Sequence, residues 1–231
     1  MLGCQTQYRI IAVNDGSRDR TGEALKDLST DYPVRLIEHC SNMGLGAALR
    51  TGLLAAAEEA LDDDVVVTMD SDNTHDPKYI LGMLVAARKA DIVVGSRYVA
   101  GGAQLNVPPH RVVLSKMINN VVGVLFRLPV KDATSGFRCF KAMTLKRLRG
   151  ALGEGIVDSN GFDSSLELLL KAVHSGGFVT EVPILLDYGK KGGNSKMRLF
   201  STIVKYVVLI LKFKRLTRAS SSRQALAKRR T

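Results

Sequence analysis

The sequence is poor in cysteine, and it has no tryptophan, no long apolar run and no visible leader. Its three cysteines, Cys4, Cys40 and Cys139, are widely spaced and fit no metal or redox motif. This spacing excludes a disulfide framework and favours a reducing compartment. No apolar run approaches the ~20 residues of a membrane-spanning helix. The first residues lack the basic and apolar regions of a secretory signal, so we expect a cytoplasmic location.

Acidic residues are absent from the C-terminal segment. Residues 196–231 contain 11 Lys and Arg and no Asp or Glu, which leaves 22 of the 33 basic residues to balance all 22 acidic ones. The net charge of +11 therefore comes entirely from this segment. A formally neutral main domain argues against nucleic acid as a partner and favours a basic appendage that meets an anionic surface.

Short apolar runs alternate with helical patterns along the chain. Strands are expected at residues 8–13, 34–38, 65–69, 91–94 and 178–183, and helices at 21–28, 44–61, 77–89, 111–126 and 162–174. Such alternation is typical of βαβ units. We therefore predict an α/β fold with a mostly parallel central sheet flanked by helices.

Two carboxylates one residue apart, Asp70 and Asp72, follow the apolar run 65–69. We read this run as a buried strand of a parallel sheet, and ligands of open α/β sheets bind just beyond the carboxyl ends of the strands. Mg²⁺ typically binds one or two carboxylates together with substrate phosphates. The pair therefore predicts a metal–diphosphate site. The alternative is a polar turn that merely ends a strand.

Further polar motifs stand after other predicted strands, at residues 13–17 (VNDGS), 95–98 (GSRY) and 193–196 (GNSK). Together with the Asp-Ser-Asp, residues 132–138 (DATSGFR) and 181–183 (EVP), they occur in an order that resembles the inverting family 2 glycosyltransferases, which have a GT-A fold. Within that family the sequence is most similar to dolichyl- and polyprenyl-phosphate mannosyl- and glucosyltransferases. The resemblance covers roughly residues 9–214.

The resemblance implies a nucleotide-sugar donor and a divalent metal. Asp15 matches the residue that holds the nucleotide base or ribose, and Ser17 and Gly44 are expected beside it. Asp70 and Asp72 are expected to bind Mg²⁺ or Mn²⁺ and the donor diphosphate.

The resemblance also implies a polyprenyl or dolichyl phosphate acceptor. The residues expected to grip or position it are Arg97, Arg111, Ser115, Asp132, Lys190 and Lys196. Glu167 matches a further acidic residue on a helix, although a helix-dipole partner facing solvent is a simpler interpretation. Simpler alternatives also exist for Arg97 (a surface arginine) and for Arg111 with Ser115 (a solvated helix face).

Three departures from the family pattern stand out. Thr74 replaces a Gln that is often a metal ligand, which either weakens the metal site or transfers that role to His75. Lys190 replaces an Arg and lacks its bidentate fork. The usual opening strand with a P-x-Y/F-N-E motif is absent, which suggests a fragment, a misassigned start or a divergent member with impaired activity.

We therefore expect a metal-dependent, inverting transfer of a hexose from GDP-mannose or a UDP-sugar to a polyprenyl phosphate. A phosphate monoester is already anionic near neutral pH, so this acceptor needs no strong base. One alternative is a GT-A enzyme that acts on a saccharide hydroxyl in polysaccharide assembly, with Asp132 as the base. Another is a truncated, non-catalytic subunit.

The chain is predicted to divide into a catalytic domain (1–196), an amphipathic helix (197–216) and a basic disordered tail (217–231). The longest uninterrupted apolar run of the helix, 206–211, is six residues. A helix of this kind, with Ser201, Lys205 and Lys212 on a polar stripe, is expected to lie on the anionic cytosolic face of a membrane. The alternative is a helix packed on the sheet with its lysines in water.

Overall fold

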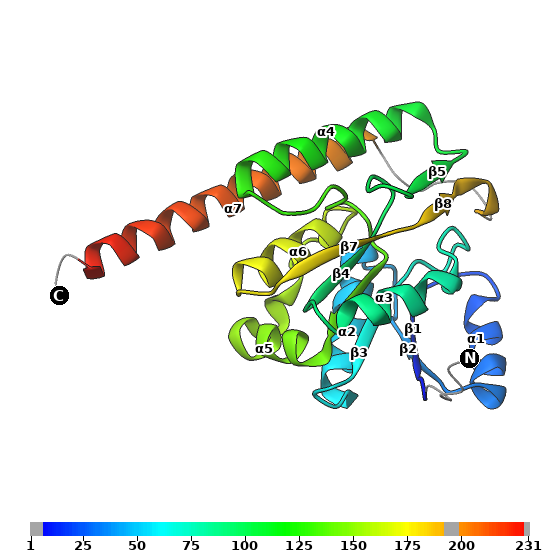
Figure 1. Ribbon diagram of the computed structural model, residues 1–231. Coiled ribbons are helices and arrows are strands. Elements are labelled where there is room, and N and C mark those ends of the chain that lie inside the picture. Colours follow the sequence, from blue (N-terminus) through cyan, green and yellow to red (C-terminus); the bar gives the residue numbers. More distant parts are fainter. Residues whose placement is uncertain (1–6, 192–198, 229–231) are drawn as a thin grey trace.

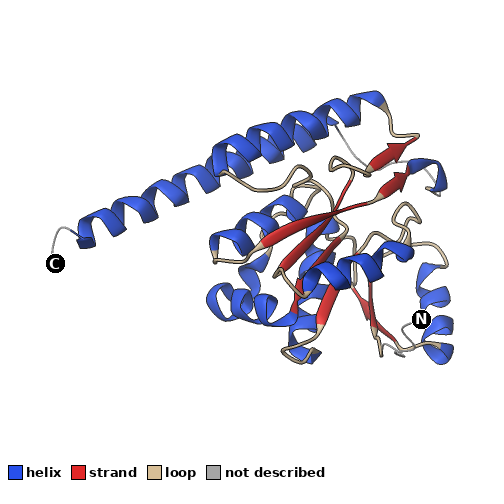
Figure 2. Cartoon of the chain, in the orientation of Figure 1, coloured by secondary structure: helices blue, strands red, loops and turns tan. Residues whose placement is uncertain are grey.

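The central sheet has four strands in the order β3-β6-β4-β7 (Figures 1 and 2). They are β3 (Val65–Thr68), β6 (Arg138–Lys141), β4 (Ile92–Ser96) and β7 (Val179–Pro183). In this computed structural model, which describes residues 7–191 and 199–228, β4 runs parallel to β7, and β6 runs antiparallel to both β3 and β4. The segment 65–69 was expected to be a buried strand of a parallel sheet. It is instead a half-buried edge strand whose one partner among the described residues is antiparallel.

Two small sheets accompany the central one. β1 (Ile10–Asn14) pairs in parallel with β2 (Val34–Glu38), and β5 (Ala103–Leu105) pairs in parallel with β8 (Leu185–Asp187). Within the described ranges, β1 and β2 form a sheet separate from the central one, so β1 and β3 each have a partner on one edge only. The single central sheet predicted from the sequence is therefore divided, although most strand pairs are parallel.

Helices cover both faces of the central sheet. Successive side chains of a strand point to opposite faces, and in this sheet apolar side chains on each face join a separate hydrophobic cluster. Ile92 and Phe140 belong to the larger cluster, which is shared with α2 (Leu45–Glu59), α5 (Ala142–Leu152) and α6 (Ser164–His174). Val93 and Cys139 belong to the smaller cluster on the other face, under α3 (Ile80–Ala87). The site residues follow strands that are packed in this way from both sides.

The remaining short elements lie at the edges of the domain. α1 (Thr21–Asp31) contacts β2 and has no buried residue. Three single turns of 3₁₀ helix are η1 (Pro77–Tyr79), η2 (Gly153–Ile156) and η3 (Tyr188–Lys190). The helix predicted to start at residue 77 does start there, capped by the Asp76 carboxylate, which accepts a bond from the Lys78 N–H, but the chain makes one 3₁₀ turn before α3 begins.

Two long helices, α4 (Pro109–Phe126) and α7 (Leu199–Lys228), lie side by side along one side of the molecule (Figure 1). Phe126 and Phe213 meet edge to face with ring centroids 6.3 Å apart. α7 extends over 217–228, where the sequence predicted a disordered tail, while 197–198 and 229–231 lie outside the described residues. No described helix is both long and apolar enough to cross a membrane.

Candidate active site

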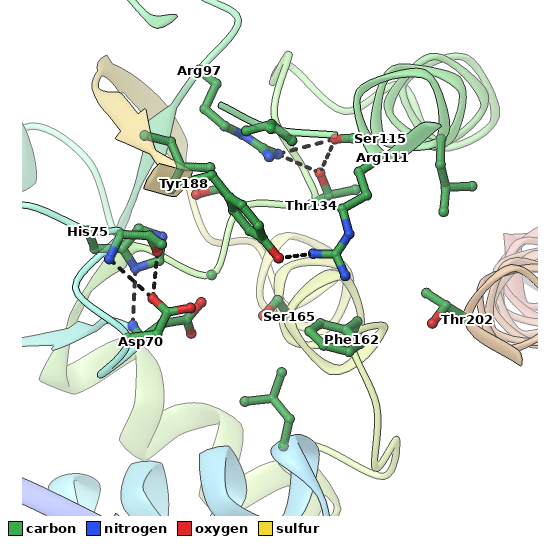
Figure 3. Close-up of a pocket in the computed structure, with 18 of the residues that line it drawn as sticks. Asp70, His75, Arg97, Arg111, Ser115, Thr134, Phe162, Ser165, Tyr188 and Thr202 are labelled. Atoms are coloured by element: carbon green, nitrogen blue, oxygen red, sulfur yellow. Dashed lines mark hydrogen bonds between the residues drawn. The ribbon is translucent and has the colours of Figure 1, made fainter. Parts of the chain in front are cut away.

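A cleft opens at the carboxyl ends of β3 and β4, and side chains of α4 and α7 line it as well (Figure 3). It has about 1030 Å³ of open space, its solvent-filled mouth included. Of the residues predicted from the sequence, those that line it are Asp70, Asp72, Arg97, Arg111 and Ser115. The structure therefore brings the predicted metal residues and acceptor residues into one cavity.

The carboxylate end of the cleft is a tight turn after β3. Asp72 Oδ1 accepts bonds from the Thr74 N–H at 3.2 Å and from Thr74 Oγ1 at 2.6 Å, and Asn73 adopts a positive φ of 63°. Thr74 thus acts on Asp72 through hydrogen bonds. Burial alone would raise the pKa of Asp72, but bonds from Lys191 and Thr74 hold that pKa below its ordinary value. Asp72 is therefore an anion at neutral pH.

His75 is hydrogen-bonded to the same turn. Its Nδ1 accepts the Asp70 N–H at 3.0 Å, and its ring stacks on Phe137 with centroids 4.9 Å apart. Burial lowers the pKa of His75, which keeps the imidazole neutral and able to accept this bond. Loss of water raises the pKa of Asp70, and the adjacent Asp72 charge adds to that rise.

The opposite end of the cleft is cationic. Arg97 forms a bidentate pair with the fully buried Asp132, with Nε 2.7 Å from Oδ2 and Nη2 2.6 Å from Oδ1. The Arg97 backbone N–H also donates to Oδ2, at 3.0 Å. Burial opposes the charge of Arg97, but Asp132 holds the Arg97 pKa above its ordinary value. Both Asp132 oxygens are therefore committed to Arg97.

Hydroxyl groups extend this cationic end. Arg97 Nη2 donates to Ser115 Oγ at 3.2 Å and to Thr134 Oγ1 at 2.9 Å (Figure 3). Arg111, one turn before Ser115 on α4, donates from Nη1 to Tyr188 Oη at 2.6 Å. Ser115 and Arg111 are close because residues four apart share a helix face, and that face lines the cleft. Two guanidinium groups and two hydroxyls thus converge where an anion would fit.

Of the other predicted residues that the structure describes, none lines the cleft. Asp15 accepts the Met43 and Gly44 N–H groups at 2.9 and 2.8 Å and contacts His39 Nδ1 at 2.7 Å. Burial opposes ionisation of Asp15, but these partners hold its pKa below the ordinary value. The Ser17 N–H donates to Asn14 Oδ1 at 3.1 Å, which closes the turn after β1.

Gly44 is required at its position for two reasons. Its φ is +95°, and a Cβ there would lie 2.5 Å from the Asn160 carbonyl oxygen. The next residue, Leu45, lines the cleft, so the turn of Asp15 adjoins the carboxylate end. Lys190 is exposed at the end of η3, and Lys196 lies outside the described residues.

The profile of the family described as glycosyl transferase family 2 matches residues 4–149, more than half of the chain. The protein is a family 2 glycosyltransferase. It is 35% identical over 194 residues to the polyprenol monophosphomannose synthase of Mycolicibacterium smegmatis, covering 83% of this chain and 71% of that protein. It is 31% identical over 189 residues to the undecaprenyl-phosphate mannosyltransferase of Micrococcus luteus, covering 81% and 75% respectively.

A third relative of the glycosyltransferase is the dolichol-phosphate mannosyltransferase of Pyrococcus furiosus, at 35% identity over 205 residues. The match covers 87% of this chain and 53% of that protein, so the chain spans about half the length of this relative. These three relatives confirm the resemblance predicted from the sequence motifs.

Solved structures confirm the GT-A fold of the glycosyltransferase. Glucosyl-3-phosphoglycerate synthase from Mycobacterium tuberculosis, in complex with Mn²⁺, UDP and glucosyl-3-phosphoglycerate, superposes with a TM-score of 0.59 at 17% identity. The match covers 89% of this chain and 68% of that chain. At this identity the likeness shows the fold alone.

A divalent metal fits the carboxylate end of the glycosyltransferase's cleft. The described residues contain no cluster of three or more His, Cys, Asp and Glu side chains that could enclose a metal. Two carboxylates nevertheless face the cleft, and a positive group already lies against one of them, since Lys191 Nζ is 2.5 Å from Asp72 Oδ2. Two carboxylates completed by phosphate oxygens and water are the usual environment of Mg²⁺ in nucleotide enzymes.

Several residues that support the site were not predicted from the sequence. Arg138, in the DATSGFR motif, is fully buried and binds main-chain carbonyls, donating to Ala133 O at 2.7 Å and to Ser165 O. Burial lowers its pKa to about 10. Arg138 thereby fixes the loop of Thr134 to the start of α6. The arginine is visible in the sequence, in a motif dominated by turn residues, but no pattern there indicates its burial or its partners.

Glu167 is also buried, against the simpler expectation of a solvent-facing residue. Its Oε2 accepts the Asp158 and Ser159 N–H groups at 3.1 and 2.7 Å, and its Oε1 lies 2.5 Å from Lys171 Nζ. The loop held in this way packs on the start of α2, where a Cβ at Gly46 would lie 1.7 Å from the Ser159 carbonyl oxygen. Glu167 therefore supports the turn that contains Gly44.

Proposed function

We propose that this glycosyltransferase moves a hexose, with inversion and with the help of a divalent metal, from a nucleotide-sugar to a polyprenyl phosphate. The observation that carries the proposal is the polarity of one cleft. Its carboxylate end holds Asp70 and Asp72, and its cationic end holds Arg97, Arg111 and Ser115. A metal-bound diphosphate and a phosphate acceptor need these two kinds of environment side by side.

The chemistry needs positioning more than proton transfer. An oxygen of the acceptor phosphate forms a bond to the anomeric carbon, while the bond from that carbon to the donor diphosphate breaks and the nucleoside diphosphate departs. The acceptor is already anionic at neutral pH. Arg97 and Arg111 would hold it against a second anion and offset their repulsion. Asp70 and Asp72 would hold Mg²⁺ or Mn²⁺, which stabilises the charge on the leaving diphosphate.

The contacts of Asp132 disfavour the alternative in which the acceptor is a saccharide hydroxyl. That reaction needs a general base, and Asp132 was the candidate. Asp132 is fully buried, and its two oxygens accept three bonds from Arg97. Asp132 is also absent from the residues that line the cleft. We assign Asp132 to the positioning of Arg97.

The outer face of α7 supports attachment to a membrane surface. Tyr206, Leu209 and Phe213 are buried, and Lys212, whose side chain is 53% exposed, donates to Asp158 at 3.2 Å. The exposed side chains of α7 include an apolar row of Phe200, Val204, Val207, Val208 and Leu211. Lys205 and Lys212 are exposed, as the packed-helix alternative also expects, so the support for membrane attachment is the exposed apolar row on the same helix.

The adjacent α4 presents a similar row. Its exposed apolar side chains are Val113, Met117, Val121, Val124 and Leu125, spaced as one helix face. We propose that α4 and α7 together rest in the headgroup region of the cytosolic leaflet, with the basic residues of α7 against anionic lipids. The cleft lies beneath these helices, since Arg111 and Ser115 on α4 and Thr202 and Tyr206 on α7 line it.

The test is a transfer assay with GDP-mannose, UDP-glucose and other nucleotide-sugars. Undecaprenyl or dolichyl phosphate is the acceptor in one series and an oligosaccharide in the other, with Mn²⁺ or with chelator. We expect metal-dependent transfer to the polyprenyl phosphate only. Transfer to the oligosaccharide alone would support the saccharide-hydroxyl alternative. Absence of both transfer and donor hydrolysis would support the non-catalytic alternative.

A further inference from the structure

Lys191 places its ammonium group at the position where the carboxylate pair would take a cation. Lys191 Nζ lies 2.5 Å from Asp72 Oδ2, and both side chains are about three-quarters or more buried (21% and 25% exposed). The other oxygen of Asp72 is occupied by Thr74. Lys191 therefore competes with a metal for Asp72 Oδ2 while it stays in place.

The charge balance makes this contact conditional on the donor. Asp70 and Asp72 supply at most two negative charges, so a divalent ion and the ammonium together would leave the site with excess positive charge. A diphosphate changes this balance, because it brings anionic oxygens that both cations can share. A lysine suits such an exchange, since its compact charge and three donors sit on a flexible four-carbon stem.

Tyr188 would keep the ammonium inside the cleft during the exchange. Lys191 Nζ lies 5.3 Å from the centre of the Tyr188 ring, within the range of a cation–π interaction. The Arg111 guanidinium also lies 5.3 Å from that ring and donates to its hydroxyl at 2.6 Å. Lys191 thus sits between the carboxylate end and the cationic end, where the diphosphate and the acceptor phosphate would approach each other.

We infer that Lys191 is the resident counter-ion of the metal site and a ligand of the donor diphosphate. In the unliganded protein it neutralises Asp72. When the donor arrives with its metal, Lys191 releases Asp72 and moves to a diphosphate oxygen. Metal and nucleotide therefore bind cooperatively, and the metal alone binds weakly. This inference rests on the proposed function, since it assumes a nucleotide-sugar donor and a divalent metal.

The experiment measures Mn²⁺ binding directly, by electron paramagnetic resonance of free Mn²⁺ and by calorimetry, for the full chain without and with GDP or UDP. In Lys191→Met we expect Mn²⁺ alone to bind about tenfold tighter, and the gain in Mn²⁺ affinity caused by nucleotide to shrink by about tenfold, within the usual range of coupling between two ligands. Lys191→Gln should behave in the same way and guards against a packing effect of Met.

Lys146→Met is the matched control. It removes the same charge from a lysine on α5 that pairs with Asp62 at 2.7 Å, outside the cleft, and it should bind Mn²⁺ like the parent protein. Equal Mn²⁺ binding by the parent and both Lys191 variants, alone and with nucleotide, would overturn the role of Lys191 and leave the proposed function intact. If the parent fails to bind Mn²⁺ even with nucleotide, the metal-dependent function falls, and the inference falls with it.

Discussion

Asp132 shows how contacts separate two roles that a residue type leaves open. An aspartate near an acceptor site can remove a proton or hold a cation, and its sequence position suits both. The structure surrounds Asp132 with the Arg97 guanidinium and backbone N–H, so its charge is used to orient Arg97. Arg111 also had two possible roles, as an acceptor residue or as part of a solvated helix face. Its guanidinium lies in the cleft and donates to the Tyr188 hydroxyl, which favours the first role.

Replacing Arg111 should impair the acceptor selectively. In Arg111→Ala, we expect the KM for polyprenyl phosphate to rise about 10- to 100-fold, the loss of one charge-assisted bond, while the KM for nucleotide-sugar changes little. Steady-state kinetics with each substrate varied in turn would measure this. Lys116→Ala, an exposed residue on the same helix, is the control. Equal losses for both substrates would argue against an acceptor role for Arg111.

Asp15 gives the protein an acid-sensitive contact. Because the folded-state pKa of Asp15 is lowered, its stabilising contribution is complete above the unfolded pKa of about 4 and is lost as pH falls through the folded value. Asp15→Asn should therefore lower the free energy of unfolding by about 1–3 kcal/mol at pH 7 and by less in acid. Urea denaturation of both proteins at several pH values tests this. A difference that stays constant down to pH 2 would contradict it.

At the scale of elements, the loop between η2 and α6 links the turn that contains Gly44 to α7. Glu167 holds its backbone, the loop packs on Gly44 and Gly46, and Lys212 of α7 reaches Asp158 within it. Removing Glu167 leaves two N–H groups without their charged acceptor and takes one of two carboxylates from Lys171, which keeps Asp158 at 3.1 Å. Glu167→Ala should therefore lower stability by about 3–5 kcal/mol, whereas the exposed Glu154→Ala should change it little. Denaturant titration would compare the unfolding midpoints of the two variants. Equal midpoints would show that Glu167 does not stabilise the fold.

The apolar row of α7 predicts how the protein meets lipid. Val207→Asp with Val208→Asp should abolish most co-sedimentation with phosphatidylserine-containing vesicles, because two charges would enter the headgroup–acyl boundary. The matched control is Leu81→Asp with Val85→Asp, which charges two exposed apolar residues of α3. Equal loss in both double variants, or no loss in either, would show that α7 does not anchor the protein.

Over the whole molecule, the sequence predicted the elements better than their pairing. The strand runs near residues 10, 34, 65, 92 and 179 and the helices after them were visible, since apolar periodicity is a local signal. β6 and α5 were not predicted, because RCFK is short and α5 follows it without a turn. The antiparallel pairing of β6 with β3 and β4 depends on contacts far apart in sequence.

The site divides in the same way. Asp70, Asp72, Arg97 and Ser115 stand in short motifs whose spacing can be recognised, and the structure places them in one cleft. The sequence did not predict the roles of Tyr188 and Lys191 or the burial of Arg138. Each of these residues acquires its role through a partner more than twenty residues away in the sequence. Long-range partners carry no local sequence signal, so these residues emerged only from the fold.

The separation of β1 and β2 from the central sheet bears on the kinetics of unfolding. Among the described residues, no strand pairing ties this sheet to β3, so it is free to open as a cooperative unit while β4 and β6 stay folded. We expect amides of β1 to exchange with solvent deuterium at least ~10-fold faster than those of β4. A nucleotide bound at the Asp15 turn should slow that exchange in proportion to its occupancy. The donor would then stabilise the small sheet that binds it. The time for which β1 and β2 stay folded would increase with the concentration of nucleotide-sugar.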